Sequence, residues 1–145
     1  MQNYLFVGNS NGGIRAFDLK SQKEQKPLAD DTTVGRQNKV TCLDVSHDGG
    51  FMLSGYKGGQ VALWDLVGYK LVRVVSDLHA TDVVVARIYH VDENESLFAL
   101  TAEDAGRVQL VRFYKKNFLG GYSSEAQFLF KHRLQGTTAI AIQRK

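Results

Sequence analysis

The chain has 145 residues, with 43% hydrophobic and 23% charged side chains, which is the composition of an ordinary globular domain with a core. Its formal net charge of +3 comes from interspersed basic and acidic residues, so the charge requires neither a nucleic-acid nor a lipid partner. The single cysteine, Cys42, excludes an internal disulfide and is compatible with the reducing cytosol. Because Met1-Gln-Asn-Tyr4 has no basic start and no long apolar run is present, we expect neither a secretory signal nor a membrane-spanning segment.

The first part of the chain contains two short apolar runs, Tyr4 to Gly8 and Ile14 to Asp18, joined by a segment with two glycines. Short apolar runs flanked by glycines predict strands, and a glycine-containing gap between them predicts a hairpin loop. The stretch that follows, Lys20 to Lys39, is polar and contains Pro27, as a linker does. We expect it to include a weak outer strand.

The middle of the chain predicts four successive strands. Val40 to Val45 alternates apolar and polar residues and ends at the turn His47-Asp48-Gly49-Gly50. Two apolar runs separated by a glycine-rich loop come next, and Lys70 to Val75 supplies the fourth strand. The second of these runs, Val61 to Trp64, is apolar at every position, which predicts a strand covered on both faces.

The last third predicts a similar but looser set of strands. The expected elements are a first strand at Val83 to Val91, a turn at Asp92 to Glu95, a strand pair that runs from Phe98-Ala-Leu-Thr-Ala102 through Gly106 to Val111 as in the second copy, and an outer strand at Ala126 to Phe130. Beyond them, Thr137 to Ile142 repeats the alternation of Val40 to Val45. We therefore expect the first strand of a further sheet there.

These copies recur at a fixed offset of 47 residues, as the pairs Gly8 and Gly55 and Asp18 and Asp65 show. The residues of the repeat motif are Gly8, Phe17, Asp18, Gly55, Gly59, Trp64, Asp65 and Gly106. A period of this length that ends in an aromatic-Asp pair is typical of β-propeller blades of the WD40 kind. In the third copy Val111-Arg112 replaces the Trp-Asp pair. Such repeat scaffolds usually display surfaces for partners.

The fold class predicted is therefore all-β, an incomplete WD40-like propeller with about three four-stranded blades and the first strand of a fourth. The expected blades cover residues 1–36, 37–82 and 83–136, and the start of the fourth covers 137–145. Propellers have about four to eight blades, so this number does not close a ring. We expect the two end blades to expose apolar side chains that a neighbour should cover.

Candidate catalytic and ligand-binding groups do not form a convincing site. Ser46-His47-Asp48 contains the residue types of a hydrolase triad, but consecutive residues on a turn cannot form its hydrogen-bond relay. The loop Gly55 to Gly59 lacks the Gly-Lys-Ser/Thr ending of a phosphate loop. The polar residues expected on the innermost strands, Asp44, Arg87 and His90, are scattered. We predict no catalytic residue and no cofactor-binding residue.

Metal binding is not predicted either. The carboxylates Asp92, Glu93 and Glu95 do not have the spacing of a calcium loop, so a solvated turn is the better interpretation. His79 and His90 have no Cys or His companion at the spacing of metal ligands. For His79, beside Asp77 and Asp82, we expect a hydrogen bond that holds the inter-blade loop.

Two surface features near the end of the third copy are open to a partner-binding interpretation. Basic residues gather around its last strands: Arg107, Arg112, Lys115 and Lys116. A solvated blade edge is the default interpretation, and a site for phosphate or for an acidic partner is the alternative. Phe118 and Tyr122 lie in a glycine-rich connection, where they either fold back on the blade or anchor an interface.

A more specific resemblance rests on three segments: Leu53 to Leu66 with its Leu-Trp-Asp-Leu ending, Ser76-Asp77-Leu-His79, and Gly106 to Lys115 with its Phe-x-Lys ending. With them, about residues 4 to 142 resemble the amino-terminal propeller of the vacuolar protein sorting-associated protein 8 family, a subunit of the CORVET endosomal tethering complex. The resemblance implies a non-catalytic scaffold in endosomal and vacuolar protein transport. It also implies binding to a Rab-type GTPase and to other tether subunits, and a cytoplasmic location peripheral to endosomal or vacuolar membranes.

Members of that family are longer and carry a solenoid and a zinc-binding RING domain, whose cysteines this chain does not have. We expect protein partners, no nucleic acid, no small-molecule substrate and no cofactor or metal. The candidate partner contacts are Tyr56, Lys57, Asp77, His79, Lys115, Lys116, Phe118 and Tyr122. Two alternatives remain: a WD40 interaction scaffold of another assembly, and a phosphoinositide-binding propeller. The Phe-Arg-Arg-Gly motif of some lipid-binding propellers is absent, which disfavours the second.

Overall fold

The structure of the protein is a computed structural model that describes residues 3–30, 33–34, 38–116, 121–130, 134 and 137–143. The described residues form ten strands and no helix. The strands are β1 (Tyr4–Gly8), β2 (Ile14–Asp18), β3 (Val40–Val45), β4 (Phe51–Tyr56), β5 (Val61–Asp65), β6 (Lys70–Val75), β7 (Val83–Val91), β8 (Leu97–Glu103), β9 (Val108–Lys115) and β10 (Tyr122–Phe128).

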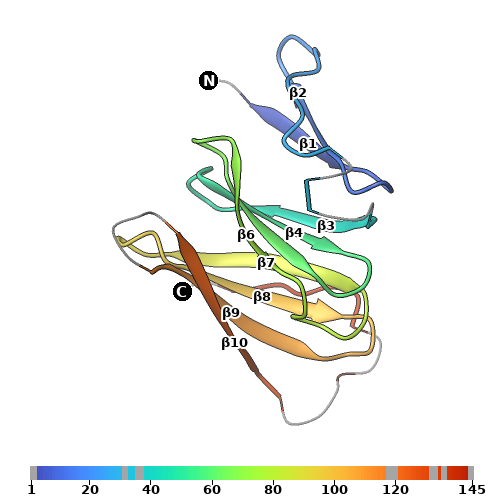
Figure 1. Ribbon diagram of the computed structural model, residues 1–145, viewed down its shortest axis with the longest axis vertical. Coiled ribbons are helices and arrows are strands. Elements are labelled where there is room, and N and C mark those ends of the chain that lie inside the picture. Colours follow the sequence, from blue (N-terminus) through green and yellow to red (C-terminus); the bar gives the residue numbers. More distant parts are fainter. Residues whose placement is uncertain are drawn as a thin grey trace.

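The strands form three antiparallel sheets, β1-β2, β3-β4-β5-β6 and β7-β8-β9-β10, in which chain neighbours are also sheet neighbours. The sheets follow one another as the blades of a propeller do, and they do not close into a ring (Figure 1). The innermost strands β3 and β7 contact each other, and β1 contacts β3. The prediction of an all-β, open propeller is therefore confirmed. We call the three sheets blade 1, blade 2 and blade 3.

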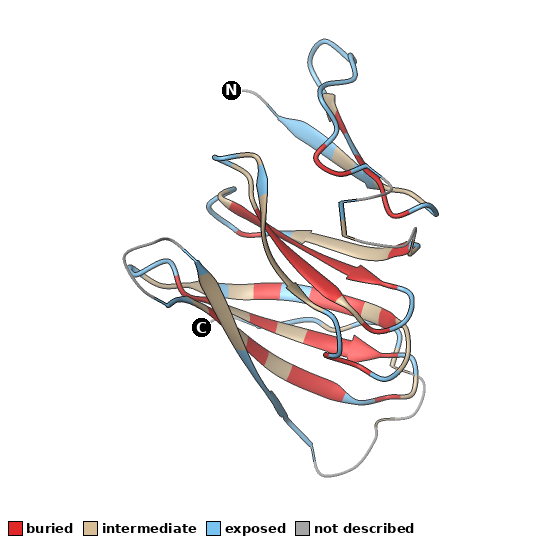
Figure 2. Cartoon of the chain, in the orientation of Figure 1, coloured by how far each residue is buried: buried red, intermediate tan, exposed pale blue. Residues whose placement is uncertain are grey.

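Strand β5 shows how a blade is shared between two cores. Val61 and Leu63 pack in the core between blades 2 and 3, whereas Ala62 and Trp64 pack in the core between blades 1 and 2. All four residues are buried, because successive side chains of a strand point to opposite faces and a neighbouring blade covers each face. Figure 2 shows this burial concentrated in the central strands of blades 2 and 3, whereas β1 is largely exposed. The prediction of a strand covered on both sides is confirmed.

The 47-residue repeat is present in the backbone as well as in the sequence. Gly12, Gly59 and Gly106 have φ values of 91°, 97° and 92°. In each case a Cβ atom would overlap a carbonyl oxygen of the segment that leads to the next blade: Asn38, His79 and Leu134, respectively. The repeat therefore places a glycine where the left-handed backbone and the close approach of a second chain segment exclude a side chain.

The aspartate that ends the motif closes a turn. Asp18 Oδ1 accepts a hydrogen bond of 2.8 Å from the Lys20 N–H, and Asp65 Oδ1 accepts one of 2.9 Å from the Val67 N–H. Blade 3 has Arg112 at this position, and its strand β9 continues to Lys115. The sequence difference in the third copy is thus accompanied by a longer third strand.

Two predicted strands need correction. The outer strand of blade 3 is β10, Tyr122–Phe128, rather than Ala126 to Phe130, since its pairing with β9 begins at Tyr122 opposite Lys115. The third strand of blade 3 begins at Val108, the position equivalent to Val61, as the repeat predicts. The linker Lys20 to Lys39 has no outer strand among its described residues, which make only isolated bridges to β2.

The predicted strand Thr137 to Ile142 is not formed in the described segment 137–143. Ile140 nevertheless packs with Leu134 against Val85, Ala102 and Val108, on the face of blade 3 that points away from blade 2. A strand requires a hydrogen-bonding neighbour, and no strand among the described residues pairs with this segment. The segment therefore packs on the blade as an innermost strand does, but it forms no inter-strand hydrogen bonds with another strand of the described residues.

Candidate protein-interaction surface

The loops of the propeller lie on two opposite rims, because the strands of each blade are antiparallel. The glycine rim comprises residues 9–13, 38–39, 56–60, 76–82 and 103–107. The aspartate rim comprises residues 19–24, 46–50, 66–69, 92–96, 116 and 121. The loops of each rim are joined by their own hydrogen bonds.

Hydrogen bonds between blades hold the glycine rim. The His79 N–H donates to the Gly59 carbonyl at 3.1 Å, and the Gly58 N–H donates to Asp82 Oδ1 at 2.8 Å. The Asp104 N–H donates to the Asp82 carbonyl at 2.8 Å. The connection between blades 2 and 3 is therefore bonded to the hairpin turns of both blades, so exposed side chains on this rim stand on a fixed backbone.

A buried polar cluster lies beneath this rim. His79 Nε2 is 2.8 Å from Thr101 Oγ1, and His79 Nδ1 is 3.5 Å from Glu103 Oε2. Glu103 Oε2 also accepts hydrogen bonds from the Ala80 and Thr81 N–H groups, at 3.0 and 3.3 Å. Burial lowers the pKa of the His79 imidazole, and the nearby Glu103 carboxylate opposes this only in part. The expected role of His79 in holding the inter-blade loop is confirmed, although its partners are Thr101 and Glu103 rather than Asp77 and Asp82.

Two of the candidate partner contacts are wrong as surface residues. Tyr56 and His79 are buried, Tyr56 between blades 1 and 2 and His79 against blade 3. Burial raises the pKa of Tyr56 to about 12, and its hydroxyl is hydrogen-bonded to Ser54. Sequence reasoning placed both residues in loops, and loop residues beside a blade interface turn inward. Lys57 and Asp77 are exposed on the glycine rim and stay candidates.

The other candidates lie on the aspartate rim, so the predicted contacts do not form one surface. Lys116 is exposed there, and Lys115 forms an ion pair with Glu95. Tyr122 is half-buried; its hydroxyl donates to the Glu95 carbonyl at 3.1 Å, and its ring meets that of Phe51 edge-on. Tyr122 thus folds back on the blade. Phe118 lies outside the described residues.

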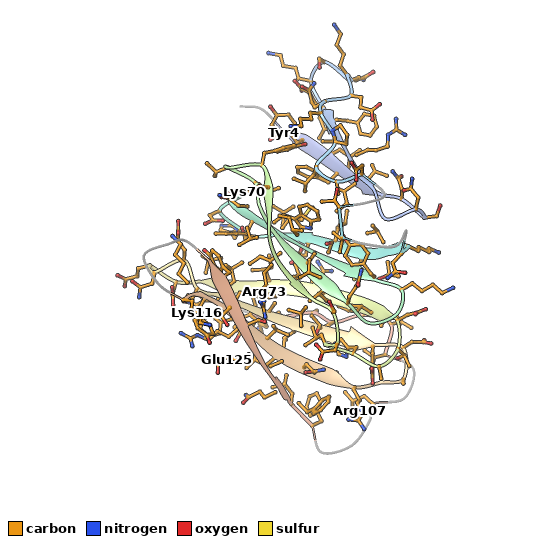
Figure 3. The ribbon with its side chains drawn as sticks, viewed as in Figure 1. Tyr4, Lys70, Arg73, Arg107, Lys116 and Glu125 are labelled. Atoms are coloured by element: carbon orange, nitrogen blue, oxygen red, sulfur yellow. The ribbon has the colours of Figure 1, made fainter. Side chains whose placement is uncertain are left out.

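The basic residues of blade 3 are dispersed. Figure 3 shows Arg107 and Lys116 at opposite ends of the blade, and an eight-residue strand such as β9 spans roughly 26 Å. Arg107 stacks over the Phe128 ring, and Arg112 pairs with Glu125 at 2.9 Å. The interpretation as a solvated, internally paired blade edge is favoured over a single anion site.

The structure gives a structural role to the remaining sequence candidates. Ser46 Oγ donates to Asp48 Oδ1 at 2.6 Å within the turn, and the same Asp48 oxygen accepts the Gly50 N–H at 2.9 Å. Asp92 Oδ1 accepts the Asn94 and Ser96 N–H groups, as a turn residue does.

The other candidates have no ligand-binding arrangement either. Arg87 pairs with Asp44 at 3.6 Å on the innermost strands. Cys42 is half-buried, and burial raises the pKa of its thiol. Within the described ranges no group of three or more His, Cys, Asp or Glu side chains is placed to hold a metal. In the same ranges no helix has the length and apolar character to cross a membrane.

Sequence reasoning missed a cleft of about 700 Å³ on the aspartate rim between blades 1 and 2. Tyr4, Phe6, Leu66, Val67 and Tyr69 line it, with Lys26 at its border. Val67, which is 88% exposed, lies two residues after the Asp65 that ends the repeat motif. It was a visible signal, because an apolar residue at a hairpin tip has no packing role in its own blade.

The protein is built from successive antiparallel sheets whose connecting loops are hydrogen-bonded to one another. These features define its class, a β-propeller of the WD-repeat kind. The family described as the Vps8 beta-propeller matches residues 1–143, and the chain belongs to this family. This confirms the resemblance inferred from the motifs.

Relatives of two kinds match the chain. The vacuolar protein sorting-associated protein 8 homologue of Mus musculus is 27% identical over 126 residues, which cover 87% of this chain and 8% of the relative. WD repeat-containing protein 18 of Rattus norvegicus is 40% identical over 81 residues, 51% of this chain and 19% of the relative. The chain thus spans less than a fifth of the length of either curated relative.

Solved structures show the same fold. The Cps50 (Swd1) β-propeller domain of Myceliophteria thermophila superposes with a TM-score of 0.66 at 21% identity, over 87% of this chain and 35% of that one. A chain of the mitotic checkpoint complex superposes with a TM-score of 0.61 at 18% identity, over 74% and 29%.

Proposed function

We propose that the chain is a non-catalytic propeller module of a vesicle-tethering subunit in vacuolar and endosomal protein transport. Membership of the Vps8 β-propeller family, over residues 1–143, carries the proposal. The structure supports a binding role because the polar residues at the candidate catalytic positions serve turns, ion pairs and blade contacts. The partners are a Rab-type GTPase and other tether subunits, at the cytoplasmic side of endosomal or vacuolar membranes.

The glycine rim is the surface best suited to such a partner. Its backbone is fixed by hydrogen bonds between blades, so a partner meets preorganised loops at little entropic cost. Lys57 and Asp77 are exposed on it, and so are Lys39 and Asp104. This mixture of charges suits recognition in which electrostatic complementarity sets specificity.

The test is binding of the purified chain to a panel of Rab-type GTPases, each loaded with a non-hydrolysable GTP analogue or with GDP. We expect preferential capture of one GTP-form endosomal Rab protein. Lys57→Glu should reduce its capture about tenfold, whereas Lys116→Glu, which reverses a charge on the opposite rim, serves as the matched control. Equal capture of both nucleotide forms, or of none, would contradict the Rab-binding role.

A second candidate function is a WD-repeat interaction scaffold of another assembly. The 40% identity to WD repeat-containing protein 18 over 81 residues favours it. Affinity purification from cytosol with identification of the bound proteins separates the two: tether subunits support the first function, and partners without any tether subunit support the second. A phosphoinositide-binding role predicts retention on anionic vesicles without protein partners.

A further inference from the structure

The connection between blades 2 and 3, residues 76–82, is held on blade 3 by three buried polar side chains. His79 belongs to the connection, and Thr101 and Glu103 belong to β8. The side chains of His79 and Glu103 are 0% and 1% exposed, and Thr101 is also fully buried. An imidazole between a hydroxyl and a carboxylate can gain a proton close to neutral pH, so the charge of His79 bears on how the connection is held.

The surroundings of the His79 ring determine which of its nitrogens carries the proton at neutral pH. Glu103 Oε2 lies 3.5 Å from Nδ1, and Thr101 Oγ1 lies 2.8 Å from Nε2. The negative charge of the carboxylate favours a proton on Nδ1, which leaves Nε2 as an acceptor. Thr101 then donates its hydroxyl proton to Nε2, and the hydroxyl has no other acceptor within the described residues.

A second proton on the ring removes this acceptor. Nε2 becomes a donor, so Thr101 has to accept, and its own hydroxyl proton is left buried without an acceptor. Glu103 compensates only in part, because its Oε2 already accepts the N–H groups of Ala80 and Thr81. His79 Nδ1 itself has no hydrogen bond of normal geometry within the described residues. The closed connection therefore disfavours the protonated ring, whereas water satisfies both of its N–H groups.

The other charged groups around the connection do not favour a protonated ring. Arg107 Nε lies 3.9 Å from Glu103 Oε1, so its positive charge partly offsets the carboxylate that an imidazolium needs. The Asp82 carboxylate accepts the Gly58 N–H of blade 2. The remaining charged residues next to the connection are exposed, where water and salt screen them: Lys57, Asp77 and Asp104.

We propose that a proton on His79 opens the connection between blades 2 and 3, so that residues 79–81 leave Glu103 while both blades stay folded. The opening is local because Ala80 is exposed and Thr81 is half-buried, and because polar contacts rather than apolar packing hold these two residues. The glycine rim thereby becomes sensitive to acid. The proposal concerns the rim itself and does not rest on the vesicle-tethering role.

Proton linkage gives the direction and the size of the response. Burial lowers the pKa of His79 in the closed connection, whereas a solvated ring in the open connection has the ordinary pKa of about 6.5. Between the lowered pKa and about 6.5 the open form therefore binds more protons. In this window the ratio of open to closed connection should rise up to about tenfold for each pH unit of acidification.

The first experiment determines the tautomer of His79. Long-range ¹H–¹⁵N spectra of the imidazole in the ¹⁵N-labelled protein, recorded at about pH 7.5, show which nitrogen is protonated when the ring is neutral. We expect the proton on Nδ1. A proton on Nε2 would overturn the proposal, because Thr101 would then be the acceptor before acidification and would lose nothing by it.

The second experiment measures amide hydrogen exchange of Ala80 and Thr81 from about pH 7.5 to about pH 5, on both sides of the ordinary histidine pKa. After correction for intrinsic exchange, both amides should open more often as the pH falls, by the factor given above. They should also open at least about tenfold more often than Leu63, which lies in the core between blades 2 and 3 and reports on global unfolding. Opening that does not change with pH, or that equals the opening of Leu63, would contradict a local release.

Two variants identify the group that binds the proton. In His79→Gln the pH response of Ala80 and Thr81 should disappear, whereas in Glu103→Gln, which keeps an acceptor for both amides, it should persist. The reverse result in either variant would assign the proton to Glu103 and overturn the proposal, so each variant decides by itself. His47→Gln, at an exposed turn of the opposite rim, is the matched control and should keep the response. Near-ultraviolet circular dichroism of the buried Trp64 reports whether each variant is folded.

Discussion

The indole N–H of Trp64 donates a hydrogen bond of 2.8 Å to Ser54 Oγ inside the core between blades 1 and 2. In blade 3 the equivalent residue, 47 positions after Ser54, is Thr101. Its Oγ1 lies 2.8 Å from Nε2 of His79 instead of from a tryptophan. Blade 3 has Val111 where blade 2 has Trp64, so the second strands of these two blades are held by different side chains. Blades 2 and 3 thus share a hydroxyl at this position while its partner changes, and blade 1 has Val7 there.

Trp64→Ala should lower the free energy of unfolding by about 3–5 kcal/mol, the usual cost of removing a large buried aromatic side chain. Trp64→Phe should cost less, because it keeps most of the packing and loses mainly the bond to Ser54, which contributes about 1 kcal/mol. Urea unfolding followed by far-ultraviolet circular dichroism measures both. Val67→Ala, at an exposed tip, should change stability by less than about 0.5 kcal/mol. Equal losses at both positions would contradict the core placement of Trp64.

Gly59→Ala should destabilise the protein far more than Gly58→Ala. Both glycines have φ near +95°, with values of 97° and 93°, so an alanine is strained at either position, by about 1–2 kcal/mol. At Gly58 the added Cβ meets nothing within 4 Å, whereas at Gly59 it overlaps the His79 carbonyl. The difference between the unfolding free energies of the two variants, measured in urea, gives the cost of the overlap with the His79 carbonyl. Similar free energies for both variants would contradict the close approach of His79 to Gly59.

Stability should decrease as the pH is lowered below about 6.5, the ordinary pKa of histidine. Because burial lowers the pKa of His79 in the folded state, the unfolded chain binds more protons between the lowered pKa and the ordinary one, and stability rises with pH in this window. His79→Gln should remove this part of the pH dependence.

The measurement is the urea midpoint at pH 7.5 and at pH 5.5, with His47→Gln, an exposed turn residue, as the control. A pH dependence that persists unchanged in His79→Gln would show that His79 is not the group responsible. Asp48, whose pKa is lowered by the Ser46 and Gly50 hydrogen bonds, loses its contribution to stability only at more acidic pH than this window.

Binding of a GTP-form Rab protein, as proposed above, should weaken as the salt concentration rises from about 0.05 to 0.5 M, because exposed charges beyond roughly one Debye length of about 10 Å are screened. Surface plasmon resonance at several salt concentrations should show the effect mainly in the association rate. In Lys57→Glu the salt dependence should be smaller or reversed. An affinity independent of salt would indicate a contact made chiefly by apolar residues, such as those of the cleft at Val67.

The sequence predicted the fold well where the repeat is strong. The strands at Val40–Val45, Lys70–Val75 and Val83–Val91 begin and end where the pattern indicated, because apolar alternation and flanking turns mark both ends. It failed at the outer strand of blade 3, where the first residues of β10, Tyr122 to Glu125, have no apolar pattern, and the apolar residues up to Phe130 that indicated a strand continue past its end. Thr137 to Ile142 had the right pattern, but a strand also needs a neighbour, which no local pattern can reveal.

The candidate surface was harder to predict. The candidate partner contacts were chosen because they lie between predicted strands. Tyr56 and His79 are buried at the blade interfaces, so they do not belong to the exposed surface. The separation of Lys57 from Lys116 onto opposite rims follows from strand direction, a tertiary property. Glu103, which is buried and accepts two backbone N–H groups beside His79, was missed because an acidic side chain followed by Asp104 in a glycine-containing turn gives no local signal of burial.

The division of β5 between two cores has a consequence for how the molecule opens. Val61 and Leu63 belong to one core while Ala62 and Trp64 belong to the other, so fraying of either outer blade leaves one side of this strand covered. In native-state hydrogen exchange, the amides of β4 and β5 should therefore exchange last, and those of β1 and β10 should exchange through local openings. Blade 2 is the coupling unit of a quasi-one-dimensional array, in which each sheet is stabilised through its neighbours.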